Sequence, residues 1–168
     1  MTSTAYQQEQ TMDKATVITT PSDQEIVSER VFAAPRDRVF SAYTDPHQIP
    51  QWWGPRRMTT IVHEMDVRPG GAWRFVSHDP DGQEYDFRGV YREVTPPERL
   101  VQTFGWEGMS GETIVETVTF EDLGENTKVT IRSVFHTLQE RDEMVAYGME
   151  HGLRESHERL DELLADAR

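Results

Sequence analysis

The chain has 168 residues, no cysteine and a formal net charge of -13 at pH 7. A chain of this length fits one domain that buries roughly 70% of its unfolded surface, and the lack of cysteine excludes a disulfide framework, a thiol nucleophile and a thiolate metal site. An acidic surface repels polyanions, so neither nucleic acid nor an anionic membrane surface is an expected partner.

The beginning of the chain is polar and shows no periodicity. Such a composition predicts a disordered tail over 1–13, followed by a single folded domain over 14–168. The tail lacks the apolar run of a signal peptide, and no stretch approaches the roughly 18 apolar residues of a membrane span. The sequence therefore favours a cytoplasmic location.

After the tail, the pattern predicts a short strand at 15–20, a longer strand at 24–33 and then two short helices. Pro35 suits the first turn of one helix, and Asp45 followed by Pro46 is an N-cap signal for the other. Six more strands separated by turn residues are expected at 58–67, 72–77, 84–94, 99–107, 112–121 and 127–136. Their short connections favour antiparallel pairing.

A long amphipathic helix is predicted over 137–167. Thr137 and Glu140 have the spacing of a capping box, and an apolar stripe runs through Met149, Leu153 and two later leucines. An antiparallel sheet with one apolar face needs a covering layer, and this helix is the available element. The predicted fold class is α+β, with a curved antiparallel sheet around a long C-terminal helix.

Aromatic residues recur at alternate positions of three predicted strands, so each set lies on one face of the sheet. Such rings either fill a core or line a small-molecule cavity. On the last helix, Gly148, Gly152 and Ser156 form a stripe of small residues, which leaves room either for close packing against the sheet or for a cavity. The candidate ligand contacts are Trp73, Phe75, Phe87, Tyr91, Phe104, Trp106, Met149, Gly152 and Leu153.

Glu116 is the odd polar residue on its strand, because Ile114 and Val118 share its parity. If that face points inward, the carboxyl group must be paired, hydrated or protonated. The alternatives are an error in the strand parity or a position at the wet edge of the sheet. Gln102 and Ser133 on neighbouring strands are placed to supply hydrogen bonds, so Glu116 and Gln102 are candidate polar contacts of the same ligand.

The histidines carry little signal. His151 and Glu155 have the spacing of helical metal ligands and His157 lies nearby, but a third converging ligand is missing, so we interpret them as a solvated helix face and expect no metal. The sequence contains no nucleophile elbow, P-loop or dinucleotide fingerprint, and it predicts no catalytic residue and no cofactor.

Several unusual strings occur in order along the chain: VFAAP at 31–35, VF at 39–40, YTDP at 43–46, QWWGP at 51–55, an Asp at 66 followed by RPGG at 68–71, and PERLV at 97–101. Together they resemble the Aha-type family, small proteins similar to the C-terminal domain of activators of the heat-shock-protein-90 ATPase. The resemblance runs from about residue 24 to 164. It implies the START-like (SRPBCC) superfamily and its helix-grip, Bet v-like fold, in which the gap between sheet and helix often holds an apolar ligand.

Three functions follow as alternatives. The first is a non-enzymatic binding protein for a small apolar molecule, acting as a monomer or homodimer, with Trp52 and Trp53 as a hydrophobic plug near the mouth rather than a lid. The second is a cyclase- or hydrolase-like enzyme with Glu116 as general base in an apolar pocket. The third, implied by the resemblance, is a chaperone-interaction module of the stress response that works through its outer surface. Activators of the eukaryotic kind dock with an additional N-terminal domain, where this chain has a short polar tail.

Overall fold

The computed structural model describes residues 15–109 and 111–166, and within these residues eight strands form one antiparallel sheet. Along the sheet the strand order is β1-β2-β8-β7-β6-β5-β4-β3. The strands are β1 Val17–Thr19, β2 Glu25–Phe32, β3 Thr59–Met65, β4 Ala72–His78, β5 Glu84–Thr95, β6 Arg99–Trp106, β7 Ile114–Asp122 and β8 Thr127–Val134. Turn residues at the predicted breaks separate β3 to β8, as the sequence indicated. The predicted tail over 1–13 lies outside the described residues.

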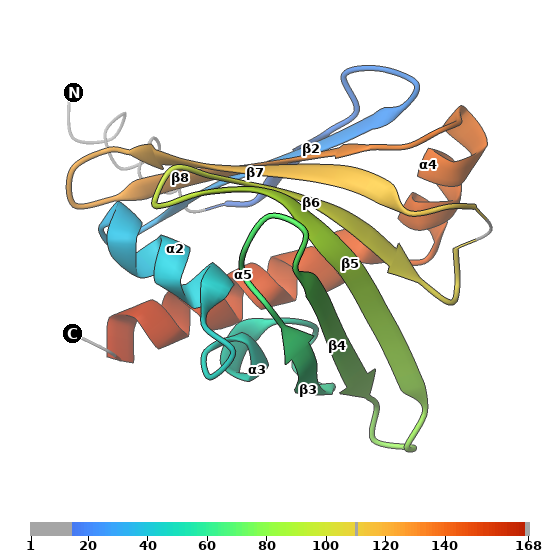
Figure 1. The fold of residues 1–168 in the computed structure, drawn as a ribbon, viewed down its shortest axis with the longest axis horizontal. Helices are drawn as coiled ribbons and strands as arrows, with labels where there is room; N and C mark the ends of the chain where they lie inside the picture. The colour runs from blue at the N-terminus through green and yellow to red at the C-terminus, as the bar shows by residue number, and fades with distance from the viewer. Residues whose placement is uncertain (1–14, 110, 167–168) are drawn as a thin grey trace, which may run out of the picture.

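Two short helices, α2 Arg36–Thr44 and α3 Ile49–Trp52, follow β2, and α4 Leu138–Ala146 and α5 Met149–Asp166 end the described chain. Figure 1 shows the sheet curving around α5, which crosses its concave side, while α2 and α3 lie against the same side nearer the C-terminus. This arrangement confirms the predicted α+β class and the helix-grip fold.

The predicted helix over 137–167 is wrong in one respect, because it is broken at Tyr147 and Gly148. Gly148 has a φ of +83°, in the left-handed region that favours glycine, and its N–H donates to the Val145 carbonyl over 3.1 Å. This is the geometry of a helix C-terminus rather than of an interior position. The predicted cap at the other end of α4 is present, since the Thr137 hydroxyl accepts the Glu140 N–H over 3.1 Å.

One side of α5 is attached to the segment that links α3 to β3. The guanidinium of Arg159 donates to the carbonyl oxygens of Gly54 (2.9 Å) and Gln51 (3.1 Å). One turn earlier, the Ser156 hydroxyl accepts the Gly54 N–H over 2.9 Å. These bonds satisfy backbone groups that a short helix leaves unpaired at its end, and they fix the position of α5 relative to that segment.

The opposite side of α5 is attached to the edge of the sheet through His157, which is only 1% exposed. Its Nδ1 lies 2.7 Å from the Thr16 hydroxyl, and the Arg30 guanidinium contacts the same hydroxyl and forms an ion pair with Asp161. The interpretation of His157 as part of a solvated face is therefore wrong. Its position three residues before the buried Leu160 places it on the inner stripe of the helix.

The buried state of His157 predicts that acid destabilises the fold. Burial, together with the Arg30 and Arg154 charges, lowers the pKa of His157 to about 3, whereas an unfolded histidine titrates near 6.5. Between these two pKa values, the His157 imidazole is protonated in the unfolded chain but neutral in the folded chain. The free energy of unfolding therefore falls as pH drops from about 6.5 towards 3. We expect this residue alone to remove about 2 kcal/mol between pH 7 and pH 5.

Urea unfolding of the parent and of His157→Gln at pH 7 and pH 5 tests this expectation. The variant should lose about 2 kcal/mol less than the parent over this interval. His151→Gln is the control, because His151 lies on the same helix with its side chain 78% exposed. Equal pH dependence in the parent and the His157 variant would contradict the account.

Candidate functional site

A cavity of about 750 Å³ lies between the concave face of the sheet and α5, and residues of α2, α3 and α4 also contribute to its wall. Small-molecule sites typically enclose roughly 300–1,000 Å³. Every residue that the sequence singled out as a ligand contact lines this cavity: Trp73, Phe75, Phe87, Tyr91, Gln102, Phe104, Trp106, Glu116, Met149, Gly152 and Leu153. Their placement is observed, and their role as ligand contacts stays a prediction.

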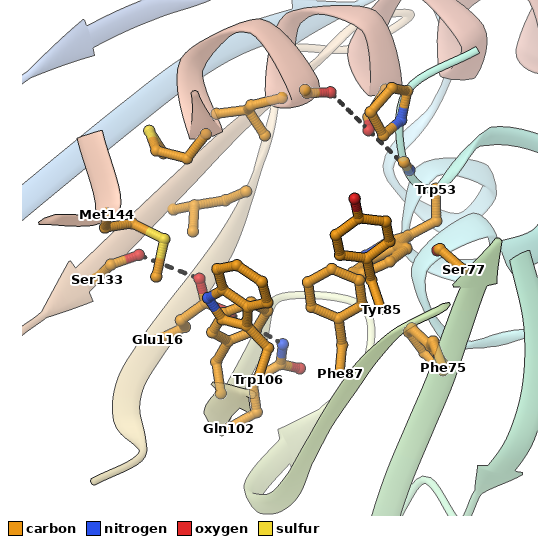
Figure 2. A pocket seen from close by; sticks show the side chains of 18 of the residues that line it. Trp53, Phe75, Ser77, Tyr85, Phe87, Gln102, Trp106, Glu116, Ser133 and Met144 are labelled. Carbon is orange, nitrogen blue, oxygen red and sulfur yellow. Dashed lines mark hydrogen bonds between the residues drawn. The ribbon is translucent and has the colours of Figure 1, made fainter. Parts of the chain in front are cut away.

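Aromatic rings form a continuous wall on the β4 to β6 side of the cavity. The ring of Trp53 meets Phe75 and Phe87 edge-on, with centroids 5.3 Å and 4.9 Å apart, and Trp106 stacks on Phe87 at 5.9 Å (Figure 2). Trp52 is buried, and its Nε1 donates to the Ala42 carbonyl over 3.0 Å. Both tryptophans line the cavity, but Trp52 also anchors α3 in the core, whereas Trp53 packs on the rings of the wall.

The indole of Trp73 lies directly over Gly89, its register partner on β5. A β-carbon at Gly89 would stand 1.9 Å from the Thr103 carbonyl oxygen and 2.4 Å from Nε1 of Trp73. That nitrogen donates to the same carbonyl over 3.2 Å. The absence of a side chain at Gly89 is therefore what allows this part of the aromatic wall to form.

A row of polar side chains crosses the sheet at the level of Glu116. In register, Ser133 pairs with Glu116, Glu116 with Gln102, and Gln102 with Tyr91. The Ser133 hydroxyl donates to Oε2 of Glu116 over 3.1 Å, and the Gln102 amide donates to Oε1 over 3.4 Å (Figure 2). The structure places Glu116 on the inner face, in agreement with the strand parity.

The carboxyl of Glu116 occupies an environment that favours its neutral form. Burial raises the pKa of Glu116, and the hydrogen bonds from Ser133 and Gln102 oppose that rise. Tyr43 on α2, which also lines the cavity, is close enough to be affected by this charge: burial raises the pKa of Tyr43 first, and Glu116 raises it further. A carboxyl group held in this way can donate a proton to a bound molecule or remove one from it.

The exposed part of the cavity wall comes from the break between α4 and α5 and from the loop after α3. Tyr147 is 60% exposed, yet its ring meets Trp106 edge-on at 5.1 Å. Arg57 and His151 are further exposed residues of the wall. Sequence reasoning missed Tyr147 because it assumed one continuous helix. A glycine directly after Tyr147 is the signal of a helix end that could have found it.

Among the described residues, no group of three His, Asp or Glu side chains is placed to hold a metal ion. His151 and Glu155, the pair with ligand-like spacing, are 3.5 Å apart on the exposed face of α5. In the same part of the chain, no helix combines the length and the apolar character that crossing a bilayer requires.

The contact between Trp73 and Gly89 predicts that Gly89→Ala lowers the free energy of unfolding. The added methyl group meets backbone that cannot move away easily, and overpacking of this kind costs about 1 to 3 kcal/mol. Thermal or urea unfolding measures the change. Gly152→Ala is the control, because its β-carbon would meet only Pro55, at an ordinary 3.6 Å. A Gly89→Ala protein as stable as the parent would show that the sheet relaxes around the methyl group.

Comparison with known proteins assigns the fold to a family. The model of the family described as activator of Hsp90 ATPase homolog 1-like protein matches residues 33–165. Solved structures similar to this chain include a protein from Rhodobacter sphaeroides, with 23% identity and a TM-score of 0.83 over 91% of this chain and 99% of that one. A protein from Arthrobacter aurescens has 25% identity and a TM-score of 0.82 over 89% and 91%. A protein from Chromobacterium violaceum has 28% identity and a TM-score of 0.70 over 83% and 96%. None of the curated proteins matches the chain.

Proposed function

The chain belongs to the family of activator of Hsp90 ATPase homolog 1-like proteins, and we propose that it binds a small, largely apolar molecule, without catalysing a reaction, in the cavity between the sheet and α5. The observation that carries the proposal is the cavity itself, whose volume of about 750 Å³ suits a small molecule. The family fold supports a ligand-binding or cyclase-like domain, and the choice between these two rests on the residues of the cavity.

The composition of the wall supports an apolar occupant. Most of the lining side chains are aromatic or aliphatic, and Met144 and Met149 add flexible surface that adapts to different shapes. Several of the polar lining groups already have partners within the protein, such as Ser77 with Thr60 (2.8 Å) and Ser156 with Gly152 (2.9 Å). A ligand that enters therefore gains mainly from the burial of apolar surface, at roughly 25 cal/mol per Å².

Two substitutions at Gly152 test the proposal. Gly152→Leu should raise stability by up to about 1 kcal/mol through helix propensity, while its side chain occupies space in the cavity and weakens binding. Gly152→Ala is the matched control, because it brings the same gain in propensity with little added volume. We expect the neutral dye Nile red to bind the parent and the Ala variant alike and the Leu variant at least tenfold more weakly, as measured by fluorescence titration.

Native mass spectrometry of the freshly purified parent adds an independent measurement, and a retained small molecule is the expected result. A melting temperature clearly lower for Gly152→Leu than for the parent, together with unchanged dye binding, would contradict the proposal. That combination would mean that the helix and the sheet pack closely at this position and that the dye binds elsewhere.

The second candidate function, a cyclase- or hydrolase-like enzyme, is favoured by one observation, the carboxyl group of Glu116 in an apolar cavity. As a general base, Glu116 would have to be ionised, and activity would rise as pH increases through its raised pKa. Glu116→Gln keeps the shape and an acceptor but cannot ionise, so it should remove this pH dependence while the protein stays folded. Identical pH profiles of binding or turnover for variant and parent would exclude a role for this proton.

Cytoplasmic location, a link to the stress response and chaperone contact stay predictions.

A further inference from the structure

The polar row of Ser133, Glu116 and Gln102 is only one residue deep. Towards α4, the next inward positions on β7 and β6 are Ile114 and Phe104, which are register partners. Towards α2, the next positions are equally apolar: Val118 pairs with Leu100 and with Ile131. All of these residues line the cavity. Along the part of the wall formed by β6, β7 and β8, a molecule therefore meets polar groups at one level and apolar groups on both sides of it.

The hydrogen bonds within the row leave the O–H of a neutral Glu116 without an acceptor. Ser133 and Gln102 both direct donors at the Glu116 carboxyl, one at each oxygen. While Ser133 and Gln102 both donate, the O–H of a neutral Glu116 carboxyl is a third donor, for which the row offers no acceptor. Part of the Glu116 side chain stays accessible, and since Glu116 lines the cavity, an acceptor on a bound molecule can reach that O–H.

Charged ligands fit this level of the cavity poorly. Among the described residues, the basic side chains of the wall are Arg57 and His151, which are exposed, and His157, which burial keeps neutral. An anionic group beside Glu116 would have no counterion, and the net charge of -13 opposes its approach. A cationic group would have to lose its hydration to form a buried ion pair, for which desolvation offsets most of the attraction.

Building on the proposed function, we propose that the ligand is an uncharged, ring-containing molecule that carries an oxygen acceptor, such as a carbonyl or ether, placed to accept the hydrogen bond of Glu116. The rings follow from the wall formed by Trp53, Phe87 and Trp106, which favours edge-on and offset contacts with flat molecules. Glu116 is then a specificity-determining residue. It raises the affinity for a ligand that carries the acceptor, because an unpaired O–H in an apolar cavity costs free energy.

Three probes of one shape separate the chemical classes: 2-acetylnaphthalene as the neutral acceptor, 2-ethylnaphthalene as the hydrocarbon, and 1-(2-naphthyl)ethylamine as the cation. Their affinities are measured at pH 6 by displacement of Nile red. Because the three differ in water solubility, the informative quantity is the ratio of ketone to hydrocarbon affinity in the parent divided by the same ratio in a variant.

Glu116→Leu removes the donor at nearly the same volume, and we expect the ratio to fall about tenfold, the effect of one net hydrogen bond. Glu116→Gln keeps an N–H donor and should retain most of the preference. Glu121→Leu is the control for the loss of a carboxylate, because Glu121 lies on the same strand but is exposed and outside the cavity.

The outcomes distinguish this inference from the proposed function. If the probes bind but the ratio is the same in the parent and in Glu116→Leu, or if the amine is the probe favoured by Glu116, the inference is overturned while ligand binding stands. If no probe binds the parent and no molecule is retained on purification, the proposed function fails and this inference fails with it.

Discussion

The attachment of α5 along two flanks determines the rest of the structure. Arg159 and Ser156 bind it to the segment before β3, and His157 binds it to the edge of the sheet near Thr16. All three residues belong to the middle of the helix, and Leu160 and Leu164 beyond them are buried in the core. Arg154 and Glu155 add contacts to Thr16 and to the Arg56 N–H. Before them, Met149, Gly152 and Leu153 line the cavity. The same helix therefore packs closely towards its end and borders open space towards its start.

The coexistence of an apolar cavity and a buried carboxyl group has an energetic explanation. Replacing Glu116 with an apolar residue would relieve a desolvation penalty, so its presence does not serve stability. The same holds for the space around it, because well-packed interiors leave few voids larger than a water molecule. Both features lower stability in the empty protein, and both become favourable once a suitable molecule fills the cavity. Departures of this kind from good packing are expected at functional sites.

The sequence predicted the fold well because the strands and turns are local patterns. The prediction that Glu116 and Gln102 lie on one face depends only on strand parity. That parity is determined by the apolar residues of each strand, which must face the core. Two features could not be predicted in this way. The spacing of Gly148 from Gly152 and Ser156 is that of one helical stripe, so it predicted a continuous helix. The positive φ of Gly148, which ends α4, is not visible in that spacing. The burial of His157 depends on Thr16 and Arg30, which are far away in sequence and meet it only in the fold.

The break at Gly148 makes α4 a separate, weakly held element. None of the residues of α4 is buried, and Leu138 and Val145 are exposed, so this helix contributes little to the core. It nevertheless carries Met144 to the cavity wall and ends at Tyr147, whose ring rests on Trp106. Local opening of a weakly held element needs much less free energy than global unfolding. On the proposed function, a ligand would need only this local opening to leave, while the sheet, α5 and their shared core stay folded.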